Sequence, residues 1–276
     1  MSTTLPGVRR YQRLAISNSL TKAIMDRLVL TVIVGLGIGA MGFTMGPMWL
    51  ALEDVIAEML DQFPPEILSI AGGADMATPS GWYTGEMYSI VVPFAVIFVA
   101  VSSAARAFGG EIENRTVGLV MATPTPRGRL AFDKVVAMVV HVVIAAGLVA
   151  LLTWIGIVAS DIDIPVANVL AISLMLSLLS IVVGGIAMVV SIWIGRAVPA
   201  ILAGLLLALV MYAWSSFVPM ADEIADLAWL SPWHHYIATD PMGSGVDWPS
   251  AALLAVLAVI PLGAGLYLFR RRDIPA

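Results

Sequence analysis

Residues 166–194 read VANVLAISLMLSLLSIVVGGIAMVVSIWI and contain no charged side chain. A helix needs about 20 mostly apolar residues to cross the hydrocarbon core of a bilayer. This stretch is longer than that, so we predict a spanning helix that tilts or ends in an interfacial turn. The stretch decides the class of fold, because a chain that contains it requires lipid as part of its solvent.

Five further apolar runs of comparable length lie on both sides of this stretch. By hydropathy they cover Leu28–Leu52, Met87–Ala107, Val135–Ala159, Val198–Met220 and Ala251–Phe269. Hydrophobic residues make up 60% of the 276 residues and charged residues 12%, against roughly 45–50% and about 25% in a typical soluble domain. We therefore predict an all-α integral membrane protein with six transmembrane helices.

The loops on the two sides of the membrane carry opposite charges. When the edges of the runs are counted with the loops, all 14 Lys and Arg residues lie before the first run, between the second and third, between the fourth and fifth, or after the sixth. The other loops contain no basic residue and hold most of the 19 Asp and Glu residues. Because basic loops stay on the cytoplasmic side, we predict that both termini are cytoplasmic.

The net charge of −5 is therefore the sum of a basic inner face and an acidic outer face. The basic face suits the anionic lipids of an inner leaflet. Membrane lipids are expected partners, and nucleic acid is not.

The segments outside the runs divide the chain into an N-terminal part, residues 1–27, and a six-helix domain, residues 28–276. Residues 8–27 are predicted to form a basic amphipathic helix in the cytoplasmic interface, with Ile16, Leu20 and Ile24 on one face. The alternative is a solvated tail.

Two long loops are expected on the outer side, residues 53–86 and 221–250. The first begins with a short helical extension of the first span and later contains the turn signals Thr78-Pro79-Ser80-Gly81. The second contains the apolar stretch Ile224–Trp233, which is too short to span and is expected to dip into the membrane interface or re-enter.

Chemical groups are scarce within the predicted spans. His141 is the only ionisable residue well inside one, where it suits helix packing or a proton relay, and His234-His235 forms an adjacent pair. The chain has no cysteine and no GxxxxGK[ST] phosphate loop. It therefore lacks the usual means of binding ATP and the charges for ion coupling, so any transport requires energy from a partner.

Small residues recur at four-residue spacing inside three of the runs. They are Gly35, Gly39, Gly42 and Gly46 in the first, Ala187, Ser191 and Gly195 in the fourth, and Ala200, Gly204 and Ala208 in the fifth. Such faces allow helices to approach closely. The close neighbour is either another helix of this chain or a second chain.

The segment 109–134 reads GGEIENRTVGLVMATPTPRGRLAFDK and lies on the predicted cytoplasmic side. Its apolar stretch, Val117–Met121, is too short to span and is bounded by charges and by Thr123-Pro124-Thr125-Pro126. It is either a docking ridge for a soluble partner or simply a charged loop.

This segment resembles the ABC-2 family of ABC exporter permeases. The resemblance is carried by Glu111, Glu113, Thr116, Val117, Val120, Met121, Thr123, Pro124 and Arg127, with Arg115 where the family usually has glycine. Three further stretches are similar to family motifs in the same order: residues 77–82, residues 230–236 followed by Asp240-Pro241, and residues 269–274.

The resemblance implies a permease subunit without catalytic activity or bound cofactor of its own. It would pair with a second permease chain, identical or homologous, and with two cytoplasmic ATP-binding subunits that hold ATP and Mg. The implied coupling residues are Glu111, Glu113, Arg115, Thr116, Thr123, Pro124 and Arg127. The implied outer re-entrant residues are Ser231, Pro232, Trp233, His234 and Tyr236.

The resulting expectation is a multi-pass exporter subunit of the plasma membrane, with a hydrophobic or amphipathic substrate. Two other functions are kept open. One is a metal-handling protein or intramembrane enzyme that uses His141, His234 and His235. The other is a membrane scaffold that does not transport.

Overall fold

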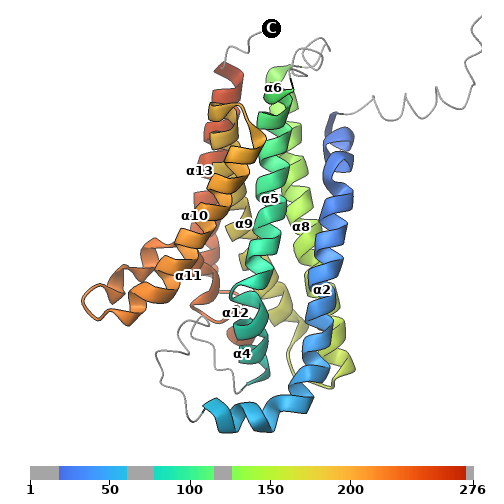
Figure 1. The fold of residues 1–276 in the computed structure, drawn as a ribbon, viewed down its shortest axis with the longest axis vertical. Helices are drawn as coiled ribbons and strands as arrows, with labels where there is room; N and C mark the ends of the chain where they lie inside the picture. The colour runs from blue at the N-terminus through green and yellow to red at the C-terminus, as the bar shows by residue number, and fades with distance from the viewer. Residues whose placement is uncertain (1–18, 61–77, 115–125, 272–276) are drawn as a thin grey trace, which may run out of the picture.

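The computed structural model describes residues 19–60, 78–114 and 126–271, and these residues form helices without any strand. Within them, six helices are long and apolar enough to cross a bilayer. They are Ser19–Val55, Val91–Glu113, Arg127–Ala159, Val166–Ile194, Ala197–Met220 and Trp248–Arg271. The predicted all-α fold with six spanning helices is confirmed (Figure 1).

The long elements are α2 (Ser19–Leu60), α5 (Val91–Ala105), α8 (Arg127–Ala159), α9 (Val166–Ile194), α10 (Ala197–Phe217) and α13 (Trp248–Arg271). Short elements join them on one side: η2 (Arg106–Gly110) and α6 (Glu111–Glu113) continue α5. The short elements of the other side are α4 (Pro79–Tyr83), η1 (Thr84–Tyr88), η3 (Val218–Met220), η4 (Ala225–Leu230), α11 (Pro232–Ile237) and α12 (Pro241–Ser244).

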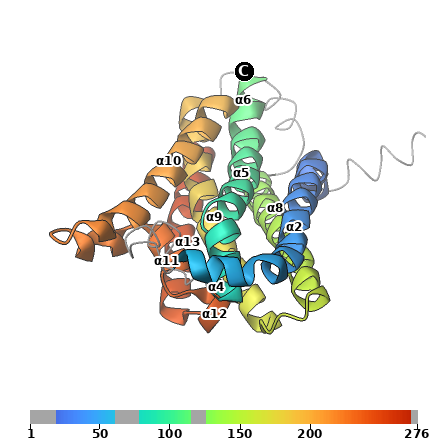
Figure 2. The ribbon, with the colours of Figure 1, turned by 60° about the horizontal axis from the view of Figure 1, so that its bottom comes forward.

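Helix α2 is continuous from Ser19, so residues 19–27 belong to the first span rather than to a separate interfacial helix. The rest of the predicted amphipathic segment lies outside the described residues. The expected extension beyond the first span is present, and α2 runs to Leu60. Its last part bends across the end of the bundle (Figures 1 and 2), and Pro47 inside the helix removes a backbone hydrogen bond near the bend.

The second and third spans differ from their predicted boundaries. The second span begins at Val91 instead of Met87, because Ile90 has a non-helical conformation (φ −133°) between η1 and α5, and it continues through η2 and α6 to Glu113. The turn signals ahead of it start α4, where the Thr78 hydroxyl accepts a hydrogen bond from the Gly81 N–H. The third span begins at Arg127, directly after Pro126.

The small residues of the first span pack against α8. A Cβ atom on Gly39 would lie 2.8 Å from Leu152 Cδ1, and one on Gly46 would lie 2.5 Å from the carbonyl oxygen of Gly156. In the same way, a Cβ atom on Gly204 of α10 would lie 2.9 Å from Val101 of α5. The close neighbour of these small-residue faces is therefore another helix of this chain, one of the two alternatives that the sequence left open.

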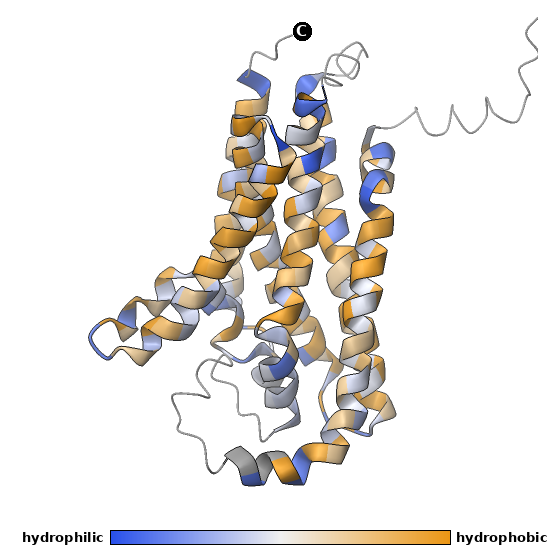
Figure 3. Cartoon of the chain, in the orientation of Figure 1, coloured by the Kyte–Doolittle hydropathy of each residue, from blue (hydrophilic) through white to orange (hydrophobic). Residues whose placement is uncertain are grey.

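Helices α5 and α9 form the centre of the bundle. In the most apolar 18-residue stretch of α9, 72% of the residues are buried inside the protein, whereas the corresponding fraction is 28% in α2 and 22% in α13. The outer helices instead present large apolar side chains on the outside, among them Ile33, Leu202, Leu206, Val256 and Val259. Figure 3 shows apolar residues along the length of the helices and more polar residues toward the two ends.

The charges segregate in space as they do along the chain. The basic residues that the structure describes lie where α2, α8 and α10 begin and where α6 and α13 end: Lys22, Arg27, Arg106, Arg127, Arg129, Lys134, Arg196, Arg270 and Arg271. We call this the basic end; it is the upper end in Figure 1. That it faces the cytoplasm remains a prediction from the charge asymmetry.

The α2–α8 contact predicts a specific sensitivity to added volume. A Cβ atom on Gly156 would lie 2.5 Å from the Phe43 carbonyl oxygen and 2.6 Å from its Cα, which are backbone atoms that cannot rotate away. Gly156→Ala is therefore expected to lower the free energy of unfolding by about 1–3 kcal/mol, measured by thermal unfolding in detergent. Gly147→Ala in the same helix is the control, since nothing lies within 4 Å of its Cβ position; equal effects would contradict this packing.

Candidate functional site

Helix α6 sits at the basic end, where the second span meets the start of the predicted coupling segment. The preceding η2 is a π-helix whose Phe108 side chain is buried and packs edge-on against Phe269 of α13, with ring centroids 5.2 Å apart. Gly109 lies against the backbone of Arg196, where a Cβ atom would come within 2.9 Å. The end of α5 is thus held between α13 and the α9–α10 turn.

Lys134 of α8 holds α6 from beside it. Its side-chain ammonium donates to Glu111 Oε2 and to the Ala107 carbonyl oxygen, each at 2.6 Å. The same nitrogen lies 5.1 Å and 5.5 Å from the ring centroids of Phe108 and Phe269. Because Lys134 is only 8% exposed, these partners replace water around its charge.

Glu113 connects α6 to the turn between α9 and α10. Gly195 ends α9 with a left-handed conformation (φ 73°), and α10 starts two residues later. Glu113 Oε2 accepts a hydrogen bond from the Ala197 N–H at 3.2 Å, and its Oε1 lies 3.7 Å from Arg196 Nε. A carboxylate at a helix N-terminus satisfies an unpaired N–H group and interacts favourably with the helix dipole.

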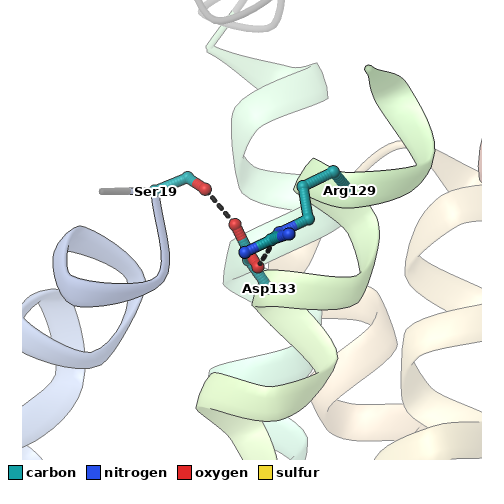
Figure 4. Close-up of polar contacts among 3 residues, drawn as sticks. All are labelled: Ser19, Arg129 and Asp133. Carbon is teal, nitrogen blue, oxygen red and sulfur yellow. Dashed lines mark hydrogen bonds and ion pairs between the residues drawn. The ribbon is translucent and has the colours of Figure 1, made fainter. Parts of the chain in front are cut away.

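Asp133 makes a third link, between α8 and the start of α2. Its buried carboxylate accepts a hydrogen bond from the Ser19 hydroxyl and pairs with Arg129 one turn earlier, at 3.1 Å (Figure 4). The three links join the ends of α2, α6, α8 and α10. We call the linking residues, Glu111, Glu113, Asp133 and Lys134, the charged platform.

The structure describes only some of the predicted coupling residues. Glu111 and Glu113 lie in the charged platform and contact other helices of this chain, a role that the sequence analysis did not assign to them. Arg127 is exposed at the first turn of α8. Arg115, Thr116, Thr123 and Pro124 lie outside the described residues.

Asp133 and Lys134 are the residues of the charged platform that sequence reasoning missed. By sequence Lys134 counts among the loop charges, but it is buried among aromatic and polar partners contributed by η2, α6 and α13. The available signal was its position next to the apolar run of the third span, which puts a cation at the border of the membrane. The distant partner Phe269 could not be inferred from that.

The outer segment forms a second organised site at the opposite end. Ser231 accepts a hydrogen bond from the Trp233 N–H, begins α11 together with Pro232, and donates to the Met211 carbonyl oxygen at 2.7 Å. Trp233 is 1% exposed, and its ring centroid lies 5.4 Å from that of Tyr212. This arrangement anchors α11 to α10; its re-entry into a membrane remains a prediction.

Burial favours the neutral forms of two titratable groups around this segment, Tyr88 and His234. The Tyr236 hydroxyl donates to the Tyr88 carbonyl oxygen at 2.7 Å, and burial raises the pKa of Tyr88 to about 12. Burial and the neighbouring His235 lower the pKa of His234, so it is uncharged at pH 7. His235 Nε2 lies 2.7 Å from the Trp229 carbonyl oxygen, as expected for an interfacial pair beside aromatic residues.

The three histidines do not converge on a metal. His141 Nε2 hydrogen-bonds the Ile24 carbonyl oxygen of α2 at 2.9 Å, near the basic end, whereas His234 and His235 lie in α11 at the other end. In the described residues, no group of three or more His, Asp or Glu is arranged to hold a metal ion. His141 is therefore a helix-packing residue, and the histidine-dependent alternative gains no support.

Six helices long and apolar enough to span a bilayer, with a charged platform at one end, define a multi-pass membrane protein. The family model described as ABC-2 family transporter protein matches residues 16–274. The chain belongs to this family: it is a membrane component of an ABC transporter, not catalytic by itself, and membership implies association with an ABC ATP-binding subunit. No curated protein matches the chain in the sequence comparison.

Lys134 of the charged platform and the neighbouring Arg129 are expected to contribute unequally to stability. Lys134→Ala removes a buried ammonium and leaves the Glu111 carboxylate without it, so we expect the free energy of unfolding to fall by about 2–3 kcal/mol. Arg129→Ala removes a side chain that is 67% exposed and should cost less than about 1 kcal/mol. Thermal unfolding of the two variants measures this difference. A double-mutant cycle with Lys134→Ala, Glu111→Ala and the double variant tests the link between the two residues, and additive effects would contradict it.

Proposed function

We propose that this chain is the permease subunit of an ATP-driven exporter in the plasma membrane. It works with two ATP-binding subunits, which carry ATP and Mg, and with a second permease chain that is either identical or homologous. Its substrate is hydrophobic or amphipathic. Family membership supports the transporter role, and the exporter assignment follows the resemblance of the segment 109–134 to exporter permeases.

The observation that carries this proposal is the attachment of α6. The helix continues α5 directly, is bonded to α8 through Glu111 and Lys134, and caps α10 through Glu113. A displacement of the segment 109–134 is therefore passed to three spanning helices together. A transporter that is driven by a subunit outside the membrane requires such a mechanical connection between that subunit and its spanning helices.

Two residues of this segment take different parts in coupling. Arg127 is exposed at the start of α8 and has the position of a contact to the ATP-binding subunit. Glu113 is bonded inside the chain to Ala197 and Arg196, and it transmits movement rather than binding the partner.

The membrane-facing surface supports assembly with a second permease chain. Helices α2 and α10 leave most of their apolar residues outside the bundle, where they face lipid or another permease. In the exporter reading, the first, second and fifth spans line a path between two chains. The outer segment 224–236, anchored by Ser231 and Trp233, closes that path on the far side.

Separate variants test docking and transmission. Arg127→Glu is expected to abolish co-purification of the ATP-binding subunit from native membranes, because it reverses an exposed charge at the docking position. Glu113→Ala is expected to retain co-purification while lowering ATPase stimulation, because α6 loses its link to α10. Arg271→Glu serves as the control, since it reverses another exposed charge at the same end.

The readouts are mass-spectrometric identification of the co-purified protein and its ATPase rate in liposomes. An ATP-binding subunit that remains bound to the Arg127→Glu variant would contradict the docking position. No ATP-binding subunit with the unaltered chain would contradict the exporter and favour the non-transporting scaffold.

A further inference from the structure

A cavity of about 340 Å³ lies at the basic end, between the first turns of α2 and the facing ends of α5 and α8. Its volume falls at the lower end of the range of small-ligand sites. Its lining includes Lys22, Asp26, Arg27, Ser103, Arg106 and His141. Lys22, Asp26 and Arg106 are exposed at its mouth, whereas Ser103 and His141 are buried.

The cavity contains more positive than negative charge. Lys22, Arg27 and Arg106 line it, and none of the ion pairs between described residues includes any of them. Arg27 and Arg106 lie close enough to repel each other. Of the two acidic residues in the lining, Glu111 already binds Lys134, which leaves Asp26 beside the three cations. Like charges facing each other at a membrane border are stabilised by a bound anion.

Two buried polar atoms of the lining residues have no hydrogen-bond partner. They are the hydroxyl oxygen of Ser103, which is 4% exposed, and Nδ1 of His141, which is 1% exposed. The other ring nitrogen of His141 meets a carbonyl oxygen, which only accepts, so Nε2 carries the proton there. Burying polar groups without partners costs free energy, and a ligand with acceptor oxygens and a hydroxyl group satisfies both.

We propose that this cavity binds the phosphate group of an anionic phospholipid. Arginine recognises phosphate oxygens through paired N–H donors, and Arg27 and Arg106 supply such donors from α2 and η2. The Ser103 hydroxyl, which is buried in the lining and has no partner within the described residues, donates a further hydrogen bond to the phosphate. Basic pockets between spanning helices near the membrane surface are suited to lipid headgroups, because the acyl chains remain in the bilayer.

The bound phosphate joins α2 to the end of α5. Within the described residues, α2 is linked to the charged platform at this end by Ser19 and Asp133, and the lipid adds a second link through Arg27 and Arg106. The inference does not depend on the exporter assignment, because it rests on the lining of the cavity alone.

The test uses the full-length chain, purified in detergent and stripped of lipid. Phosphatidylglycerol, phosphatidylcholine and inorganic phosphate are added separately, with bound lipid counted by native mass spectrometry and stability followed by thermal unfolding. Phosphatidylglycerol is expected to bind and raise the unfolding temperature more than phosphatidylcholine, whose choline is repelled by the arginines. The doubly substituted variant Arg27→Gln/Arg106→Gln is expected to bind it at least about tenfold more weakly.

A charge-matched control separates this site from general attraction to anionic micelles. Arg129→Gln/Arg271→Gln removes two positive charges at the same end but outside the cavity lining, and its phosphatidylglycerol affinity should stay within about twofold of the unaltered chain. Equal weakening by both double variants would overturn the proposal.

Ser103→Ala keeps the proposal testable if the arginine variant fails to fold. It removes the unpartnered hydroxyl, so the lipid-free protein should be as stable as before or more so, while phosphatidylglycerol binding weakens severalfold. Unchanged binding would overturn the proposal. If inorganic phosphate stabilises the unaltered chain but not the Arg27→Gln/Arg106→Gln variant, the phosphate site is supported. If phosphatidylglycerol then fails to displace that phosphate, the proposal that a lipid supplies the phosphate group is overturned.

Discussion

The basic end depends on the buried ammonium of Lys134. This one charge is surrounded by the Glu111 carboxylate, the Ala107 carbonyl oxygen and the rings of Phe108 and Phe269, so it brings together η2, α6, α8 and α13. A cation at this depth requires nearly all of its solvation from protein. These contacts hold α6 and the end of the second span against α8.

Below that end, the bundle is held by close packing rather than by hydrophobic burial. Lipid tails are as apolar as leucine, so helices associate in membranes through tight contacts between small residues. Gly39 and Gly46 of α2 and Gly156 of α8 allow the backbones of α2 and α8 to approach closely, and Gly204 of α10 leaves room for the Val101 side chain of α5. These contacts leave the outer faces of α2, α10 and α13 to lipid or to a partner chain.

Glu111 and Glu113 of the candidate site could be identified from the sequence, but not whether they contact a partner subunit or other helices of this chain. The pattern that contains Glu111, Glu113 and Arg127 predicts a coupling segment through its resemblance to a family, and the match to residues 16–274 confirms the family, while the coupling role stays a prediction. Reading along the chain could not distinguish a carboxylate that meets a partner from one that caps α10. That distinction depends on the α9–α10 turn, which lies more than 80 residues away from Glu113.

The sequence by itself determined the solvent, the six spans and the segregation of charge, because length, hydropathy and loop composition are local properties that the bilayer enforces directly. Tertiary structure alone decided that the glycine faces pack within the chain, that His141 binds the backbone of α2, and that Lys134 is buried. It also produced the cavity between α2, α5 and α8. Each of these depends on which residues distant in the chain meet, and no local pattern specifies that.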